Sequence, residues 1–512
     1  MRTSMHDQYG SNREPQPRRS TFNVSEAHKH TWDSSNLIPV YWDFLYPGEV
    51  RRGLTRCFVR LSNPLDYPLM DNAYLSIHWF AVPIRIIWDN FRKFFGEREN
   101  PGDSIDYTLP KYGTGNINLT AAGLATKLCD CLGLPMVASF DSGDAHALPF
   151  RAYTSIYNYW YRDSSIDNSA AISTDDGPDG DLTEYGVKYR GKAFDYFTNL
   201  LPNPQRGESV TIGGEVASDA AFGGDLTIWS TDQEIWAEMQ ANATTREIEM
   251  DNVAGAEVSK MYPNTTINEL RNAVAIQQFL ERDNRAGQLF GDLITAHYGA
   301  NFLDAKYAPS FIAGGTTPFI FSPIPNTAQN TTSGDDLGDL GAIGTSTFEG
   351  AAFTYRAQEP EILMGIVSCR ADLSYSQGLN RKWSYNSRYD FIWPEFEGVG
   401  DQAVLKKEIF YQNNATDNEV LGYGPRYEEG RIGINQLHGE FRVDHATPLS
   451  SWHLSEDFAA APALNSAFIR SEPPFDRVLK SSTVDNFIGD FHFEMYSTKA
   501  LSMRGIPGLQ RL

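Results

Sequence analysis

The sequence predicts a mainly β protein, an antiparallel β-sandwich with long helical and loop insertions between its strands. Aromatic residues make up 13% of the 512 residues, and the 42 glycines and 27 prolines favour short strands and turns over long helices. Apolar, β-prone stretches lie near both ends of the chain, whereas helical patterns and loops lie between them. Early and late strands must therefore pair across most of the chain to build one sandwich.

The N-terminal segment, residues 1–30, is polar, and we expect it to be a flexible arm because Pro15 and Pro17 oppose a helix. Residues 31–512 are expected to form the sandwich domain with its insertions. The arm carries four arginines, which are Arg2, Arg13, Arg18 and Arg19.

Three strands are predicted directly after the arm, at Leu37–Leu45, Leu54–Leu61 and Tyr74–Val82. In the second, Cys57, Val59 and Leu61 share one face, as the two-residue period of a strand requires. The third is apolar on both faces, which is typical of a strand that lies between two layers. We therefore expect its Trp79 and Phe80 to be buried.

Helical periodicity follows in four places. Residues 84–95, 120–132 and 149–161 repeat apolar side chains at helical spacing. A capping box at Thr266–Glu269 opens a longer helical pattern that extends to about Tyr298 and is interrupted near Gly287. These helices are predicted to be insertions between strands.

The C-terminal half returns to strand patterns after a predicted loop. Residues 310–350 are rich in Gly, Thr, Ser and Pro, and we expect a loop there. Strands are predicted within 362–376, 437–443 and 487–497. The last of these alternates apolar and polar residues, so that one face packs on the core.

The charge of the chain is strongly acidic, with a formal net charge of −22. This charge argues against a surface that binds duplex nucleic acid or anionic membrane as a whole. Residues 161–260 carry 19 acidic and 7 basic side chains, and the Gly-rich stretch 207–265 is predicted to be a surface insertion. Neither a secretory signal nor an apolar run of membrane-spanning length is visible, so no membrane insertion is expected.

Motifs of known chemistry are missing from the sequence. It has no Walker loop, no zinc-protease helix and no Gly-x-Ser-x-Gly elbow, so we expect no enzyme, no catalytic residues, no cofactor and no metal site. The four cysteines do not have the spacing of a zinc ribbon, and buried reduced thiols are expected. An alternative stays open: a carbohydrate-binding or carbohydrate-active β-sandwich protein, with two carboxylates and an aromatic platform in a cleft.

Several segments resemble the major capsid protein of the Microviridae, small icosahedral single-stranded DNA bacteriophages, and specifically of the gokushovirus branch. The segments occur in the family's order along most of the chain, and it is this joint order that is specific. They are Leu37–Gly48, Pro68–Asp89, Ala147–Asp163, Thr266–Gly299, Gly365–Gly378, Tyr389–Pro394, Trp452–Leu454 and Ile506–Leu509.

The resemblance implies a viral jelly roll that self-assembles into a T=1 icosahedral shell around a circular single-stranded DNA genome. It also implies three further partners: an internal scaffolding protein, a DNA pilot protein and a small basic DNA-binding protein. The subunit would assemble in the cytoplasm of a bacterial host and reside in the virion. The insertion at 207–265 would form a protrusion at the threefold axes and contribute to attachment to a host receptor that stays unknown.

A shell that holds DNA with acidic subunits needs a local cationic surface. We expect the arm to turn inward, because arginine contacts phosphate and stacks on unpaired bases. Solvation or a contact between subunits would also account for such a tail. The candidate nucleic-acid-binding residues are Arg13, Arg18, Arg19, Arg504 and Arg511.

Overall fold

The structure is a computed structural model of the whole chain, and the chain divides into two compact units. The larger unit contains Met1–Pro202, Leu289–Gly291 and Asn301–Leu512, and the second contains Asn203–Gln288 and Asp292–Ala300. The residues that the structure describes are 18–180, 185–208, 210, 226–230, 235–241, 248–251, 267–300, 308–327, 338–481 and 483–503.

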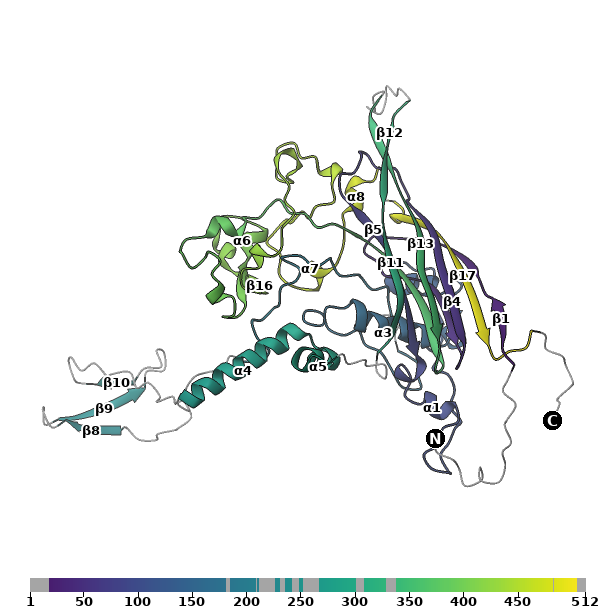
Figure 1. Cartoon of the computed structure of the whole chain (residues 1–512), viewed down its shortest axis with the longest axis horizontal. Helices are drawn as coiled ribbons and strands as arrows, with labels where there is room; N and C mark the ends of the chain where they lie inside the picture. The colour runs from purple at the N-terminus through teal and green to yellow at the C-terminus, as the bar shows by residue number, and fades with distance from the viewer. Residues whose placement is uncertain are drawn as a thin grey trace. The chain divides into compact units, whose positions relative to one another are not determined.

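Two antiparallel sheets form the larger unit (Figure 1). One has six strands in the order β1-β17-β4-β13-β12, with β2 also paired to β17, and the other has four in the order β11-β5-β14-β3. Their bounds are β1 Ser20–Asn23, β2 Glu26–Trp32, β3 Ile38–Leu45, β4 Val50–Leu61, β5 Ala73–Pro83, β11 Ser310–Pro318, β12 Ile320–Pro325, β13 Leu340–Arg356, β14 Glu361–Ala371 and β17 Phe487–Lys499.

The path of the chain between the two sheets is that of a jelly roll. Successive strands β3, β4 and β5 alternate between the sheets, and β11 passes into β12 through Phe319, so that the chain changes sheet there. The predicted fold class, a β-sandwich with insertions, is therefore confirmed. Pairing of early and late strands is confirmed as well, because Phe491 of β17 lies opposite Cys57 of β4.

The core lies between the two sheets and is rich in aromatic rings. Trp79 is fully buried, its indole N–H donates to Thr55 Oγ1 at 3.0 Å, and its ring lies 5.5 Å from that of Phe493 in the opposite sheet. Phe80, on the other face of β5, is also buried and contacts the ring of Trp160 at 5.9 Å between centroids. The prediction that both faces of this strand are covered is thus confirmed.

Helical segments follow β5, as predicted, but with different lengths. Residues 84–95, predicted as one helix, form a 3₁₀ turn at Ile84–Ile86 and a single α-helical turn, α1, at Phe91–Phe94. The pattern at 120–132 corresponds to α2 (Leu124–Cys131), and Gly133, two residues after the helix, has a φ of +87°. The pattern at 149–161 corresponds to α3 (Leu148–Ile156), which continues as a π-helical turn over Tyr157–Tyr161.

Two other predictions in the C-terminal half differ from the structure. Residues 310–350, predicted as a loop, contain β11, β12 and the first part of β13. The glycines there serve close packing: a Cβ on Gly314 would lie 2.6 Å from the His78 ring, and one on Gly315 would lie 2.7 Å from Phe348. Residues 437–443, predicted as a strand, contain a 3₁₀ turn at Gly439–Phe441.

The prediction of a flexible arm over residues 1–30 is wrong for its C-terminal part. Residues Ser20–Asn23 and Glu26–His30 lie in β1 and β2, where both strands pair with β17. Sequence periodicity did not reveal these strands because they lie at the sheet edge and expose mostly polar residues. Residues 1–17 are outside the described part of the chain.

Shorter elements complete the larger unit. A second hydrophobic cluster, around Tyr196, Phe197 and Tyr375, supports a region of short helices and strands. The remaining elements are β6 Asn116–Ile117, β7 Phe140–Asp141, β15 Gln402–Leu405, α6 Lys406–Ile409, β16 Val420–Gly424, α7 Ser466–Ile469 and α8 Phe475–Val478.

The second unit contains a small sheet and most of the long helical pattern. Its strands β8 (Leu226–Ser230), β9 (Ile235–Ala241) and β10 (Ile248–Asp251) pair in the order β10-β9-β8. The helices are α4 (Ile267–Ala286) and α5 (Phe290–Tyr298), and the predicted interruption is confirmed at Gly287, where φ is +102°. Thr266 of the capping box and most of 207–265 lie outside the described residues, so the surface insertion stays a prediction.

Replacement of Trp79 by Ala tests the central position of this residue. We expect the free energy of unfolding of the unassembled subunit to fall by about 3–5 kcal/mol, because a large ring is removed from between two sheets. Urea denaturation measures the change. Trp383, which is 81% exposed, is the matched control, and Trp383→Ala should alter the unfolding free energy by no more than about 0.5 kcal/mol. Equal losses in the two variants would contradict the assigned core.

The buried carboxyl group of Glu361 makes stability depend on pH. Its Oε2 accepts a hydrogen bond from the Tyr355 hydroxyl at 2.7 Å, and burial raises its pKa to about 7, aided by the nearby charge of Glu359. The folded chain therefore binds a proton that the unfolded chain releases at a lower pH. Stability conferred by this protonated group is lost as the pH rises through this window.

Glu361→Gln keeps the shape of the side chain and removes the titration. Between pH 4.5 and 7, we expect the unfolding free energy of the natural subunit to fall relative to the variant by up to about 3 kcal/mol. Urea denaturation at constant ionic strength measures both proteins across this range. Parallel pH profiles would show that Glu361 titrates normally.

Candidate assembly and nucleic-acid interfaces

The predicted nucleic-acid-binding residues lie at the two ends of the chain, and the structure describes two of them. Arg18 and Arg19 are exposed and directly precede β1, and the Arg19 guanidinium donates to the carbonyl oxygen of Gly48. Arg13, Arg504 and Arg511 lie outside the described residues. The pairing of Ser20 with Lys499 places the described start of the arm beside the C-terminal end of β17.

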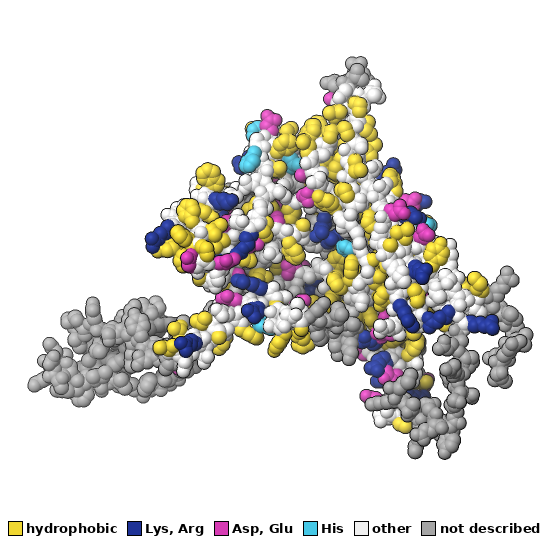
Figure 2. All heavy atoms as spheres, in the orientation of Figure 1, with side chains coloured by type: hydrophobic (Ala, Val, Ile, Leu, Met, Phe, Trp, Pro, Cys, Tyr) yellow, Lys and Arg dark blue, Asp and Glu magenta, His cyan; other side chains and the backbone are white. Residues whose placement is uncertain are grey.

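A surface that we call the basic edge lies at one end of the six-stranded sheet, where β1 and β4 begin and β13 and β17 end. It consists of four exposed arginines and one half-buried lysine, and within the described chain none of the five forms an ion pair with a carboxylate. Figure 2 shows Lys and Arg side chains over this end of the sheet. Its members are Arg18, Arg19, Arg52, Arg356 and Lys499. The acidic chain thus has a local surface of positive charge.

Carboxylates near the basic edge are held by a buried arginine below it. Arg51 is fully buried and donates to Glu49 Oε1 at 3.0 Å, to Asp43 Oδ2 at 2.6 Å and to the Tyr41 hydroxyl at 3.0 Å. The hydroxyl of Ser497 in β17 donates to the same Glu49 oxygen at 2.6 Å. Glu49 and Asp43 thus pair with Arg51, and neither forms an ion pair with a described residue of the basic edge.

Three arginines at four-residue spacing lie on the outer face of β4, and the sequence analysis did not identify this row as a candidate site. Arg56 pairs with Glu349 at 3.0 Å and Glu494 at 2.8 Å, whereas Arg52 and Arg60 make no ion pair in the described chain. The signal in the sequence was the spacing itself, since residues i, i+4 and i+8 of a strand share a face. The carboxylates that pair with Arg56 belong to Glu349 and Glu494 on other strands, so the local sequence around β4 did not indicate them.

Exposed aromatic side chains gather in the loop between β14 and β15. Trp393 Nε1 donates to the Arg388 carbonyl at 2.7 Å, and backbone N–H groups of Ser387 and Asn386 bind the Asp390 carboxylate and lower its pKa. These bonds hold the loop in one conformation while its large side chains face outward. The exposed set is Trp383, Tyr389, Phe391, Ile392, Trp393 and Val399, and Figure 2 shows hydrophobic side chains gathered around α6 and β16 in the same region.

Such an aromatic surface has the composition of a protein contact site. Trp, Tyr and Phe are enriched at the centres of interfaces, and contiguous exposed apolar patches mark interaction surfaces. The tryptophans of the chain occupy two kinds of position: Trp79 and Trp88 lie in the core, whereas Trp160 and Trp393 are partly exposed.

The remaining chemistry of the chain offers few reactive groups. All four cysteines are free and buried, and burial raises the pKa of each thiol. Across the described ranges, no three His, Cys, Asp or Glu side chains lie close enough to share a metal ion. A search of the same residues found no helix both long and apolar enough to cross a membrane.

Comparisons with known proteins give the same family over nearly the whole chain. The family described as "Capsid protein (F protein)" matches residues 13–509. Capsid protein VP1 of Bdellovibrio phage phiMH2K is 34% identical and the match covers 96% of this chain and 95% of the relative. Capsid protein VP1 of Chlamydia phage 1 is 30% identical, covering 97% and 96%, and that of Spiroplasma virus 4 is 26% identical, covering 96% of each.

These matches span both sheets, the helical insertions and the C-terminal strand, so they concern the whole fold. They agree with the resemblance to gokushovirus capsid proteins of the Microviridae that the sequence segments indicated. The chain therefore belongs to the capsid protein (F protein) family of these bacteriophages.

Proposed function

We propose that the chain is the major subunit of a T=1 icosahedral shell that encloses a circular single-stranded DNA genome. The observation that carries this proposal is the family match over residues 13–509, with relatives named as capsid proteins that cover the chain almost completely. The role is structural, without catalysis. Its partners would be other copies of itself, the packaged DNA, an internal scaffolding protein, a DNA pilot protein and a small basic DNA-binding protein, all assembled in the bacterial cytoplasm.

Assembly is tested by co-expression with an internal scaffolding protein, followed by size-exclusion chromatography and negative-stain microscopy. We expect closed icosahedral particles of uniform diameter. In the same co-expression experiment, the variant Trp393→Asp should form fewer particles, because its charge would be buried in a contact between subunits that excludes water. The contrary result is a monomer that cleaves or binds a glycan, which would favour a carbohydrate-active sandwich.

The basic edge and the arm are proposed to face the genome. Support comes from the cluster of unpaired cations where the described arm joins the sheet, and from the acidic charge of the rest of the chain. Positive charge on one face and negative charge elsewhere would orient the subunit around a polyanion. Arg504 and Arg511 are proposed for the same surface, since β17 ends beside β1.

The arm is tested by the triple variant Arg13/Arg18/Arg19→Ala. We expect assembled particles to contain less DNA and to release it with a weaker dependence on salt, because fewer phosphates are neutralised. The control is Arg92/Arg98/Arg431→Ala, which removes the same charge from exposed positions elsewhere. Unchanged DNA content per particle in the arm variant, measured by absorbance and calibrated staining, would exclude the arm as a genome contact.

Residues 207–265 are proposed to form an outer protrusion at the threefold axes that contributes to host attachment. The proposal rests on the family resemblance and on the acidic, Gly-rich sequence, which would repel packaged phosphate. Particles that lack this segment should assemble but adsorb less to host cells. Antibodies raised against the segment should bind intact particles, and failure to bind would contradict an outer position.

A further inference from the structure

Two arginines above the outer face of the four-stranded sheet have no carboxylate partner. Arg190 is 8% exposed, and within the described residues its guanidinium donates only to Ser368 Oγ, at 2.6 Å. Arg370, two residues farther along β14 than Ser368, makes no hydrogen bond or ion pair with any described side chain. Buried cations without a counter-ion are rare, because the lost hydration is not replaced.

The two charges also oppose each other. Burial, together with the positive charge of Arg370, lowers the pKa of Arg190 to about 10. Burial likewise lowers the pKa of Arg370. The nearby imidazole of His78 adds no compensating charge: burial and the same two arginines lower its pKa to about 4, so it is neutral at physiological pH. The arrangement is therefore costly unless an anion joins it.

Hydroxyl groups lie on the face of the sheet that carries Ser368, the hydrogen-bond partner of Arg190. Ser368, Ser76 and Thr316 lie opposite one another across three adjacent strands, and Ser76 Oγ and Thr316 Oγ1 are 3.0 Å apart. The Tyr161 hydroxyl lies 2.8 Å from His78 Nδ1. Several donors beside two planar guanidinium groups match the oxygens of a phosphate, which accepts more hydrogen bonds than a carboxylate does.

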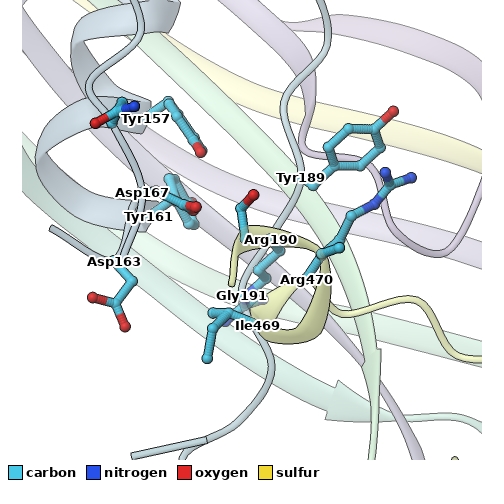
Figure 3. Close-up of a pocket in the computed structure, with 12 residues that line it drawn as sticks. Tyr157, Tyr161, Asp163, Asp167, Tyr189, Arg190, Gly191, Ile469 and Arg470 are labelled. Carbon is cyan, nitrogen blue, oxygen red and sulfur yellow. The ribbon is translucent and has the colours of Figure 1, made fainter. Parts of the chain in front are cut away.

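A cavity of about 450 Å³ begins at Arg190. Figure 3 shows Tyr157, Tyr161 and Asp167 on one side of it, and Tyr189 with Arg470 on the other. The cavity is within the size range of small-molecule sites, and tyrosine rings provide stacking surfaces for a base.

Asp167 lines this cavity, and one of its two carboxylate oxygens lacks a hydrogen-bond partner among the described residues. Its Oδ1 is buried and accepts no hydrogen bond, and burial together with the neighbouring Asp163 raises its pKa. Neither aspartate forms an ion pair with Arg190. The cavity is therefore lined by a cation, Arg190, and by an acceptor, Asp167, together with tyrosine rings on both sides.

We propose that this cavity is a nucleotide site, in which Arg190 binds a phosphate group, the nearby charge of Arg370 on β14 attracts the same anion, and the tyrosines enclose the base. Asp167 Oδ1 would accept a hydrogen bond from an exocyclic amino group, so that cytosine or adenine is preferred over thymine. The phosphate is that of a free nucleotide or of a phosphodiester in the packaged strand. The second source rests on the proposed function, because it requires that the shell enclose single-stranded DNA.

Binding to the unassembled subunit tests the site independently of the shell. Tyrosine fluorescence and thermal unfolding are followed during titration with inorganic phosphate, dCMP, dTMP, and cytidine and thymidine homo-oligomers, all at constant ionic strength. We expect phosphate to raise the unfolding midpoint, dCMP to bind more tightly than dTMP, and Arg370→Gln to weaken dCMP binding by about tenfold or more. Arg98→Gln, which removes an exposed arginine outside the cavity and the basic edge, should bind as the natural subunit does.

A second readout separates binding from a structural role. Because the two cations repel each other, Arg370→Gln without ligand should unfold at a higher temperature than the natural subunit, whereas loss of a structural contact would lower it. No stabilisation by phosphate or nucleotide, or equal binding by Arg190→Gln, Arg370→Gln and the natural subunit, overturns the proposal. A third outcome is that no nucleotide binds the natural subunit while Arg370→Gln abolishes assembly. In that case a carboxylate of another copy of the chain pairs with the arginines, and the proposal is wrong.

The two proposals fail in different ways. Nucleotide binding by a subunit that never forms particles would support this site and contradict the shell. If particles with Arg190→Gln package DNA normally, and the same change abolishes mononucleotide binding, the site binds free nucleotides and not the packaged strand.

Discussion

The pairing of β17 with β4 is the interaction on which the rest of the structure depends. β4 occupies the middle of the six-stranded sheet, so the sheet is incomplete until the end of the chain returns to it. The apolar face of β17 then supplies Phe491, Phe493 and Met495 to the core that contains Trp79. Because this contact joins the two ends of the chain, the helices and loops between them are insertions into a closed framework.

The same pairing decides where charge is placed. It brings Ser497 to Glu49 and completes the buried Arg51 network, which joins β3, β4 and β17. Breaking such a network leaves an uncompensated buried charge, so each member constrains the others. With those carboxylates occupied, the cations at the surface above remain unneutralised, and an acidic protein acquires a basic edge.

Buried arginines in this protein follow two patterns. Arg51 and Arg151 are fully buried and each has carboxylate partners; Arg151 Nε, for example, donates to Asp179 Oδ2 at 2.9 Å. Arg190 is nearly as buried but has only a serine hydroxyl. Since the other deeply buried arginines of the described residues have carboxylate partners, the contrast marks Arg190 as the position for which we propose a counter-charge from outside the chain.

The sequence alone determined those strands and helices in which apolar residues repeat with a clear strand or helix period. The strands at β3, β4, β5 and β17 were predictable because their apolar residues alternate or are continuous, and the helix break at Gly287 was predictable because glycine ends helices. The family was also recognisable, since separate segments occur in a characteristic order. These features depend on local patterning, which a single chain displays directly.

Only the tertiary structure decided the remaining features. Gly314 and Gly315 resembled loop residues, yet they lie in a strand because His78 and Phe348 leave no room for a Cβ. β1 and β2 became strands only because β17 offered an edge. Arg18 and Arg19 lie beside strands that are distant in sequence. Arg190 and Arg370 have no carboxylate partner among the described residues, and no local pattern in the sequence indicated this. Such absences are properties of three-dimensional packing, and no local pattern encodes them.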